Sequence, residues 1–334
     1  MTSVTASMSA MRPDGRNGRE AGSPQFSIVI TCCNQRPFIR AAVDSALSQL
    51  AGLREVIVVD DGSTDGCAAL LQEYGDSIQL LAMPENRGAI EARNHGAAQA
   101  RGEYLVFLDG DDILLPWALD VYERVIQERN PTVILANTTW FKGAAPELSE
   151  KDIPGGIESI YYPALIRKDR AIGLSASAYI VRRRTFWEVG GWSPGIFHLD
   201  LQDLSAKLGF QPTVYVSSPS TVHYRLHGAN SIMDIDPFLR NIRILVAKER
   251  AGEYPGGPKR RFDRAVWFGG AIVFWAKRAA SEGRSAEAAK LVLFGWRMIL
   301  AAVVRRLAFK ITGHCPVERT ELNLDRLKHP SRVP

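Results

Sequence analysis

Three carboxylates follow a strongly apolar segment within four positions. Residues 104–108 (Tyr-Leu-Val-Phe-Leu) show no polar alternation, which is typical of a strand covered on both faces in a parallel sheet. Asp109, Asp111 and Asp112 follow where that strand would end, and Gly110 lets the backbone turn there. Ligands of open α/β sheets bind at this end of the strands, and hard divalent ions commonly join carboxylates to substrate phosphates. The pattern predicts a metal and nucleotide-diphosphate site, the alternative being that Asp111 and Asp112 cap the next helix.

A second acidic group ends another predicted strand. The β-branched run at 55–60 finishes with Asp60, and Asp61 and Asp65 follow it closely. Because the carboxyl ends of parallel strands meet at one edge of a sheet, both acidic groups would face one ligand. Asp60 would then accept hydrogen bonds from a base or a ribose, while Asp109 and Asp111 hold a metal.

The segments around these groups alternate between strand and helix. Strands are expected over 26–31, 55–60, 77–83 and 104–108, and apolar residues have helical spacing over 37–50, 68–74 and 90–100. This alternation predicts right-handed βαβ units and an α/β fold with a mostly parallel, doubly wound sheet. Farther along, we expect a helix over 117–129, a strand over 131–136, a polar loop over 143–158 and a strand over 175–181.

The turn after the first strand excludes several nucleotide-binding classes. Residues 31–37 (Thr-Cys-Cys-Asn-Gln-Arg-Pro) contain no glycine, whereas a dinucleotide-binding domain needs a Gly-x-Gly-x-x-Gly turn here. No Walker-type Gly-Lys-Ser/Thr sequence occurs either. A nicotinamide enzyme and a P-loop nucleotidase are therefore disfavoured. So is a nucleotidyltransferase, which would need a glycine-rich loop with a Lys or Arg at this point.

Composition bounds the class of protein. The 334 residues are 46% hydrophobic and 23% charged, with a net charge of +5, as in a globular protein of one large domain or one domain with an extension. The four cysteines form no CxxC pair or Cys/His cluster, which argues against zinc and for a reducing compartment. No apolar stretch reaches about 18 residues, so we expect no transmembrane helix. Residues 1–25 lack an apolar core and are expected to form a disordered leader instead of a signal peptide.

Five short motifs resemble, in order, the signatures of family 2 glycosyltransferases. They are Ile-Val-Ile-Thr-Cys-Cys-Asn at 28–34, Val-Val-Asp-Asp-Gly-Ser-Thr-Asp at 58–65, Glu-Asn-Arg-Gly at 85–88, Glu-Ala-Arg-Asn at 91–94 and Leu-Asp-Gly-Asp-Asp at 108–112. The resemblance is strong over residues 26–117 and weaker up to residue 231. It implies an A-type glycosyltransferase fold, a nucleotide-sugar donor, Mn²⁺ or Mg²⁺ as cofactor, and inversion at the anomeric carbon of the sugar.

The resemblance also implies roles for single residues. Thr31 and Asp60 would contact the base of the nucleotide, Arg93 would lie near the donor, and Asp109 would contact the ribose side. Asn34, at the end of the first motif, belongs to the same nucleotide-sugar-binding set, and Asp111 would bind the metal that bridges the diphosphate. The chain departs from the family at Cys33, where an aromatic residue is commonest. Stacking on the base would therefore be weaker or supplied from elsewhere.

The catalytic base is expected between residues 197 and 204, Phe-His-Leu-Asp-Leu-Gln-Asp-Leu. In the family, a Glu-Asp pair and an Asp-Leu pair precede a helix and a glycine, which here is Gly209. Counting back without gaps puts Phe197 and His198 at the first pair, and a small gap puts Asp200 or Asp203 there. We expect Asp200 to be the base, with Asp203 as second choice and His198 as third; alternatively, these residues cap or solvate the helix.

The segment 223–231 resembles the Tyr-Arg-x-His sequence that often closes over the donor diphosphate in the family. We therefore expect Arg225 to contact the nucleotide sugar and His227 to join the metal shell. The alternative is a surface loop in which neither side chain has a specific role. His223 and His227 have no third ligand in register, so zinc is not expected here.

The C-terminal part is basic and helical. Helical spacing over 265–280 and 286–309 predicts a hairpin within 258–312, followed by a tail over 313–334. Residues 258–310 hold twelve basic and three acidic side chains, a balance of 12 − 3 = +9, with aromatic residues between them. Such helices can lie on an anionic membrane surface, or the hairpin can simply pack on the catalytic domain. Nucleic acid is not an expected partner, because no reading motif accompanies the charge.

Together these observations predict an inverting glycosyltransferase that moves a sugar from a nucleotide-diphospho-sugar to a hydroxyl of a glycan, lipid-linked or other acceptor. The first donor expected is a UDP-sugar. Residues 26–240 would form the catalytic domain, with 26–117 as the nucleotide-sugar half and 118–240 as the acceptor half. The protein would be cytoplasmic, at the inner face of a membrane if the hairpin binds lipid. Because the Glu-Asp pair is absent, the second hypothesis is a sugar-nucleotide-binding pseudoenzyme or scaffold without transfer activity.

Overall fold

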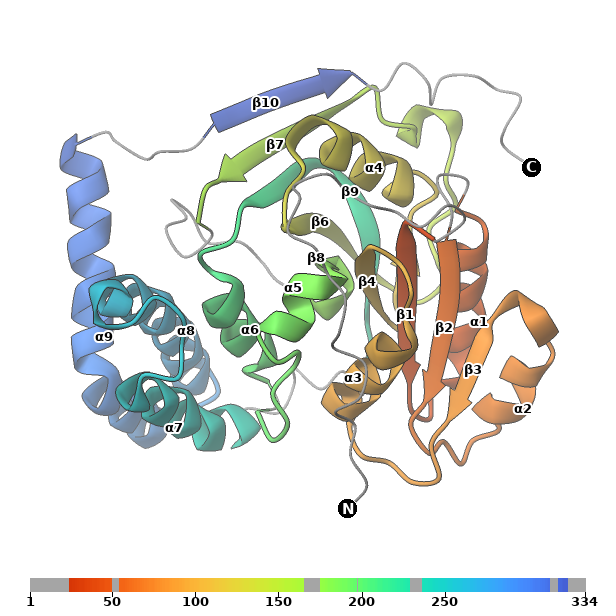
Figure 1. The fold of residues 1–334 in the computed structure, drawn as a ribbon. Coiled ribbons are helices and arrows are strands. Elements are labelled where there is room, and N and C mark those ends of the chain that lie inside the picture. Colours follow the sequence, from red (N-terminus) through yellow and green to blue (C-terminus); the bar gives the residue numbers. More distant parts are fainter. Residues whose placement is uncertain are drawn as a thin grey trace, which may run out of the picture.

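The computed structural model describes residues 24–49, 54–164, 175–196, 198–228, 236–312 and 318–323. Almost all of the expected leader, and most of the tail after residue 312, lie outside these ranges. A ten-stranded sheet forms the centre of the molecule, in the order β10-β7-β9-β6-β8-β4-β1-β2-β3, with the short β5 paired to β9 (Figure 1).

The first half of the sheet is parallel. It consists of β1 (Phe26–Cys32), β2 (Arg54–Asp60), β3 (Gln79–Ala82) and β4 (Tyr104–Asp109). Strand β1 pairs in parallel with both β2 and β4, and β2 with β3. The helices between them are α1 (Arg36–Leu47), α2 (Cys67–Gln72) and α3 (Ala89–Gln99). The predicted alternation of strands and helices is therefore confirmed, with shifts of a few residues at the ends of elements.

Two apolar cores lie on opposite faces of this sheet. Alternate residues of β1 face opposite ways, so Ile28 and Ile30 join one core and Val29 joins the other. Helices α1 and α2 cover the first face, and α3 covers the second. Helix α3 packs closely, because a Cβ added at Gly96 would meet the side chain of Val29 at 2.5 Å. Glycine at this position lets α3 pack directly against the sheet. This close contact fixes the position of α3 and of the side chains that it carries.

The second half of the sheet is mixed. Strand β8 (Tyr179–Arg182) is antiparallel to both β4 and β6 (Val133–Lys142), β9 (Thr213–Leu226) is parallel to β6, and β7 (Gly156–Tyr162) is antiparallel to β9. The short β5 (Ile113–Leu114) joins β9, and β10 (Glu318–Asn323) joins β7 at the sheet edge. Helices α4 (Ala118–Arg129), α5 (Arg183–Glu188) and α6 (Asp200–Leu208) complete this half.

Three segments of this half differ from the sequence-based expectation. Strand β6 continues six residues beyond the expected end at 136, because the residues that follow pair with β9. These residues are more polar and mostly less buried than the start of the strand, so the apolar pattern ends before the strand does. The expected loop at 143–158 contains a 3-10 helix (Glu150–Asp152) and the start of β7. Within the expected tail, residues 318–323 form strand β10, whose hydrogen bonds come from β7, over 150 residues earlier.

Three C-terminal helices pack beside the sheet, as Figure 1 shows: α7 (Asp236–Ala251), α8 (Arg261–Ser281) and α9 (Ser285–Thr312). Helices α8 and α9 form a close hairpin, because a Cβ added at Gly269 would meet the Met298 carbonyl oxygen at 2.1 Å. None of the helices in the described ranges combines the length and apolar character needed to cross a membrane.

Candidate active site

The two acidic strand ends predicted from the sequence lie at one edge of the sheet. Strand β1 lies between β2 and β4. Its last residue, Cys32, lies opposite Asp60 of β2, and the residue before it, Thr31, lies opposite Asp109 of β4. Thr31 and Asp60 are buried, and the carbonyl oxygen of Thr31 accepts a hydrogen bond from Gly110 at 2.9 Å. The strand register thus brings Thr31, Asp60 and Asp109 together from three segments.

Gly110 has a different role from the one expected. Its φ angle lies outside the left-handed region, so the turn itself does not require glycine. A Cβ at this position would instead meet the Gln35 side-chain oxygen at 2.7 Å and the Cβ of Cys32 at 2.9 Å. Glycine is needed because the loop after β4 passes close to the end of β1 and the start of α1.

Asn34 joins two loops at this edge. Its backbone adopts a left-handed conformation with φ of 53°, which asparagine tolerates better than most residues. Its side-chain oxygen accepts a hydrogen bond from the Thr64 amide at 2.8 Å, and its own amide donates to Ser63 Oγ at 2.9 Å. Asp60 accepts from the Ser63 amide at 3.1 Å. Asn34 therefore shapes the loop beside Asp60, and we infer that it acts on a ligand through that loop.

Asp61, to which the sequence assigned no role, holds the next turn in place. This buried carboxylate accepts hydrogen bonds from the amides of Arg87 at 2.7 Å and Gly88 at 2.8 Å. The Glu-Asn-Arg-Gly motif at 85–88 is thereby attached to the end of β2. The only sequence signal for this role was the proximity of both motifs to strand ends.

Arg93 connects the two halves of the molecule. It lies on α3, is buried, and donates from one guanidinium nitrogen to Asp109 at 2.7 Å and from another to Asp200 at 3.0 Å. Its guanidinium also lies 5.4 Å from the ring centroid of buried Trp192, a cation–π contact. Arg93 thus brings Asp200, expected in the acceptor half, next to the end of the nucleotide-sugar half.

Asp200 is the first residue of α6 and is nearly buried. Burial raises the pKa of Asp200, the charge of Arg93 opposes this rise, and the charge of Asp109 adds to it. A carboxylate with a raised pKa is a stronger base than an exposed one. His198, the third choice, is partly exposed and has a left-handed backbone with φ of 66°.

Asp111 and His227, both expected at the metal, lie in contact. His227 Nε2 is 2.8 Å from Asp111 Oδ2, and the imidazole ring stacks on Phe38 with centroids 4.8 Å apart. Burial and the charge of Asp109 raise the pKa of Asp111, while the contact with His227 lowers it.

Arg225 is held by protein groups around the same loop. Its guanidinium donates to the carbonyl oxygens of Asp111, at 2.9 Å, and Gly143, and lies over the rings of Phe38 and Phe141. Its backbone amide donates to Asp112 at 3.0 Å. Arg225 is 6% exposed. We infer that Arg225 positions the backbone of Asp111; its expected contact with the nucleotide sugar stays a prediction.

Asp112 is a structural carboxylate beside the site. It is 1% exposed and accepts a hydrogen bond from Ser177 Oγ at 2.5 Å as well as from Arg225. Burial and the charges of Asp109 and Asp111 raise the pKa of Asp112 well above its usual range. Ser177, which the sequence did not single out, also accepts from the Asp109 amide at 3.0 Å. The 3-10 turn Ala176–Ala178, just before β8, therefore supports the loop that carries all three aspartates.

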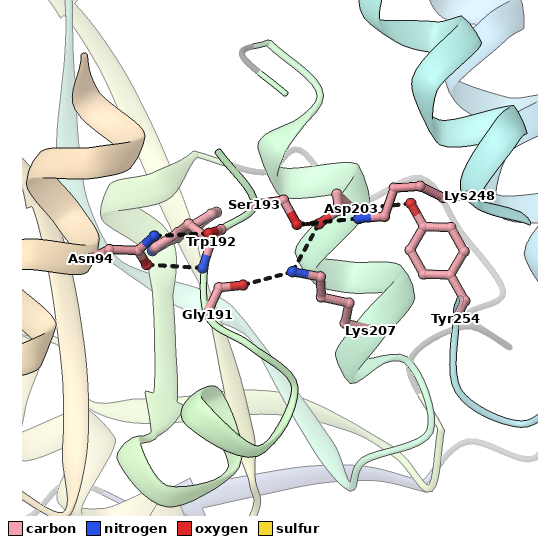
Figure 2. A network of polar contacts seen from close by, with 8 residues as sticks. All are labelled: Asn94, Gly191, Trp192, Ser193, Asp203, Lys207, Lys248 and Tyr254. Atoms are coloured by element: carbon pink, nitrogen blue, oxygen red, sulfur yellow. Dashed lines mark hydrogen bonds and ion pairs between the residues drawn. The ribbon is translucent and has the colours of Figure 1, made fainter. Parts of the chain in front are cut away.

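Asp203, the second choice for the base, lies in a separate network (Figure 2). It is fully buried, and donors surround its carboxylate: Ser193 Oγ at 2.6 Å, Lys248 Nζ at 2.6 Å, Tyr254 OH at 2.7 Å and Lys207 Nζ at 3.1 Å. With its oxygens occupied and no exposed surface, the carboxylate has no room to take a proton from an acceptor. We therefore assign Asp203 a structural role, which is to bind α6 to α7 and to the segment before α8.

The same network holds the turn before α6. Lys207 also donates to the carbonyl oxygen of Gly191 at 2.9 Å, and Asn94 of α3 makes two hydrogen bonds to the backbone of Trp192, at 2.8 and 3.0 Å (Figure 2). Gly191 has φ of +60°, and a Cβ there would meet Asn94 Oδ1 at 2.9 Å. The turn is therefore fixed from α3 on one side and from α6 on the other.

Replacing Tyr254 with phenylalanine should lower the free energy of unfolding by about 1.5–3 kcal/mol, since it removes one hydrogen bond to a buried charged group. The ring would keep its packing on Phe268, 5.5 Å away. Urea denaturation at neutral pH measures the change. Tyr224→Phe, which leaves the Asp203 network intact, serves as the matched control, and an equal loss in both variants would contradict this role.

Tyr224 and Trp140 form an aromatic pair that sequence reasoning missed. Their rings lie 5.8 Å apart on neighbouring strands, and Trp140 is 64% exposed. Burial and the charges of Asp112, Asp109 and Asp111 raise the pKa of the Tyr224 hydroxyl, which places Tyr224 beside the carboxylates. Only the position of Tyr224 within the 223–231 segment could have pointed to it.

The residues at the site fit a divalent ion that is completed by substrate oxygens. Among the described residues there is no group of three or more His, Cys, Asp or Glu side chains that could hold a metal alone. Asp111 and His227 offer one carboxylate and one imidazole, which suffices where phosphate oxygens and water supply the remaining ligands. The pKa of Asp111 is raised chiefly by burial and then by the charge of Asp109, and a cation there would offset the second of these.

Comparison with known proteins identifies the domain that carries most of these residues. The family model described as glycosyl transferase family 2 matches residues 27–189. The chain carries a family 2 glycosyltransferase domain. This finding confirms the predicted family for residues 27–189. Asp60, Arg93, Asp109 and Asp111 lie within the matched residues, whereas Asp200, Arg225 and His227 lie after them.

Relatives match the chain over different lengths. TuaG of Bacillus subtilis, a putative teichuronic acid biosynthesis glycosyltransferase, is 37% identical over 107 residues, which are 31% of this chain and 41% of that protein. An uncharacterized glycosyltransferase of Haemophilus influenzae is 26% identical over 219 residues, or 63% of this chain and 71% of that protein. The chain thus matches less than half the length of the first relative.

Two solved structures share the fold of this chain. S. aureus TarS 1-349 in complex with UDP-GlcNAc has a TM-score of 0.56 at 16% identity, covering 86% of this chain and 92% of that chain. The mannosyltransferase PcManGT from Pyrobaculum calidifontis, in complex with GDP-Man and Mn²⁺, has a TM-score of 0.54 at 16% identity, covering 85% and 87%. The predicted A-type glycosyltransferase fold is thereby confirmed.

Proposed function

We propose that the protein transfers a sugar from a nucleotide-diphospho-sugar to a hydroxyl acceptor with inversion at the anomeric carbon. The observation that carries this proposal is Arg93, which bonds to Asp109 of the nucleotide-sugar half and to Asp200 of the acceptor half. A general base is thus held next to the strand end where the donor binds. One displacement, with the acceptor and the leaving group on opposite faces of the sugar, inverts its configuration.

Asp200 takes the proton of the acceptor hydroxyl in this reaction. Its raised pKa, caused chiefly by burial, makes it a better proton acceptor than an exposed aspartate, and Arg93 keeps its carboxylate oriented. Thr31, Asp60 and Asp109 bind the nucleotide along the sheet edge. Asp111 and His227 would hold Mn²⁺ or Mg²⁺, which when bound offsets charge on the diphosphate leaving group.

UDP-sugars are the first donors to test, with GDP-sugars second. TarS was solved with UDP-GlcNAc and PcManGT with GDP-Man, and both share the present fold. The acceptor would be a glycan, a lipid-linked sugar or another hydroxyl compound. The relative TuaG bears a name from teichuronic acid biosynthesis, which favours a role in polysaccharide assembly. A lipid-linked acceptor would place the reaction at the cytoplasmic face of a membrane.

A sugar-nucleotide-binding pseudoenzyme is the second candidate. It is favoured by the residues Phe197 and His198, which stand where the family has its Glu-Asp pair. This function would need the donor site at the sheet edge but no base. It predicts donor binding without transfer and without hydrolysis.

The donor site is tested by thermal unfolding with UDP-, GDP-, dTDP- and CDP-sugars, each with and without Mn²⁺. A donor at about 100 times its dissociation constant should stabilise the protein by about 2.7 kcal/mol, because it binds the native state alone. The stabilisation should require Mn²⁺ and should be absent from Asp111→Ala. Asp152→Ala, an exposed carboxylate outside the site, is the control for charge removal.

Transfer assays then separate the two candidates. Donor-dependent product with a hydroxyl acceptor supports the transferase, and binding without product supports the pseudoenzyme. Unchanged donor affinity in Asp111→Ala with Mn²⁺ present would contradict the metal assignment.

A further inference from the structure

Helix α9 carries a continuous stripe of exposed apolar side chains. Seven large residues are each between 46% and 83% exposed: Leu293, Trp296, Leu300, Val303, Val304, Leu307 and Ile311. They recur at intervals of three, four and seven, so they lie on one side of the helix. From the first to the last, this α9 stripe is about 27 Å long at 1.5 Å per residue. Soluble proteins seldom leave such a surface uncovered.

The α9 stripe lies on the outside of the molecule. Figure 1 shows α9 at the outer edge, with α7 and α8 between it and the sheet. The opposite side of α9 packs in the hairpin, where Leu291 is buried and Gly295 approaches Ile272. Arg305 is buried against Asp263 and belongs to this packed side. The helix therefore has one side that stabilises the fold and one that does not.

Cations border the stripe on both sides. At 100° per residue, Lys290 and Arg297 lie along one border and Arg306 and Lys310 along the other, and all four side chains are exposed. The sequence contains no Asp or Glu from residue 288 to residue 312. The surface thus combines apolar area with charge of one sign.

We propose that the α9 stripe binds an anionic membrane surface. The apolar side chains would enter the boundary between headgroups and acyl chains, and the four bordering cations would lie among acidic headgroups. A second copy of the chain fits less well, because pairing two stripes would bring only positive borders together. The inference does not depend on the proposed reaction, since it concerns a surface remote from the carboxylates.

A cavity beside the stripe supports this partner. It measures about 400 Å³ and lies between α7 and α9, with Val246 and Leu293 among its apolar walls. Arg250 and Arg297 are the basic residues that line it. Two guanidiniums next to a membrane-facing surface suit one anionic headgroup, whose oxygens accept charge-assisted hydrogen bonds.

Vesicle co-sedimentation of the full chain tests the proposal. Vesicles are made of phosphatidylcholine alone, or with about one third phosphatidylglycerol. We expect binding to the anionic vesicles that weakens with added salt. The triple variant Leu293→Gln, Leu300→Gln, Leu307→Gln should bind on the order of 100-fold more weakly, and so should Arg297→Glu, Arg306→Glu, Lys310→Glu. Leu148→Gln with Trp187→Gln, exposed apolar residues of the catalytic domain, should bind as the natural protein does.

Two outcomes would overturn the inference. One is equal vesicle binding by the natural protein and the leucine triple variant, with thermal unfolding showing that both are folded. The other is unchanged vesicle binding together with a loss of self-association in the leucine variant, measured by light scattering, which would make a second copy the occupant. Equal binding to neutral and anionic vesicles would contradict the proposed contact between the cationic borders and acidic headgroups.

Discussion

Replacing Asp200 with asparagine should lower the turnover number by about 100- to 10,000-fold, the usual contribution of a general base. The amide keeps the size of the side chain and can still accept a hydrogen bond from Arg93, so the local geometry should persist. It cannot take a proton from the acceptor. Donor affinity should remain unchanged, because the nucleotide contacts come from β1, β2 and β4. Steady-state transfer and donor titration on the same preparation measure both quantities.

His198→Gln is the matched control for Asp200→Asn. His198 stands at the position of the family's Glu-Asp pair when no gap is allowed. If the glutamine variant loses transfer while Asp200→Asn keeps it, the base is His198 and our assignment is wrong.

The pH dependence of transfer adds a second check on Asp200. Burial raises its pKa, so the basic form accumulates only at pH values above the usual range for aspartate. The acidic limb of kcat/KM should therefore lie above that range in the natural protein. In Asp200→Asn, this limb should disappear from the residual activity.

Replacing Arg93 with methionine should lower the free energy of unfolding by about 3–5 kcal/mol, because the change leaves partly or fully buried carboxylates without their counter-charge. Transfer should be lost as well, since Asp109 and Asp200 would repel each other at the point where the two halves meet. Urea denaturation at neutral pH measures the loss of stability. Circular dichroism before denaturation shows whether the variant is folded.

A double variant tests whether Arg93 stabilises the protein through Asp200. Adding Asp200→Asn to Arg93→Met removes one of the two uncompensated charges, so part of the lost stability should return. The free energy of unfolding of Arg93→Lys should lie between those of the natural protein and Arg93→Met, because an ammonium group lacks the planar fork that reaches two carboxylates at once. Additive losses in the double variant would show that Arg93 and Asp200 are not coupled.

The nucleotide-sugar half could be predicted well because its signals are local. Buried strands of β-branched residues, helices with apolar spacing and acidic strand ends each lie within a few positions of one another, and parallel strands must meet at one edge. Asp60, Asp109 and Asp111 were accordingly expected at this edge. The sequence did not show that the side chains of Asn34 and Asp61 accept hydrogen bonds from loop backbone, because those hydrogen bonds join segments about 26–30 residues apart.

The acceptor half was harder, since its contacts span longer separations. Asp200 and Asp203 lie three positions apart on one helix, and nothing local distinguishes them. Arg93, 107 residues before Asp200, brings one of them to the donor edge. Lys248 and Tyr254, 45 and 51 residues after Asp203, enclose the other. The mixed strand order also depends on β8, whose antiparallel insertion between β4 and β6 has no signature in its four residues.

Two adjacent residues of α3 join the halves at the candidate site. Arg93 reaches Asp109 and Asp200, and Asn94 reaches the backbone of Trp192. What the second half offers to these two side chains is small: one carboxylate at the start of a helix and one turn with an accessible backbone. Acceptor halves with quite different sequences can meet these two requirements. The same nucleotide-sugar half can therefore be combined, at this contact, with second halves of different sequence.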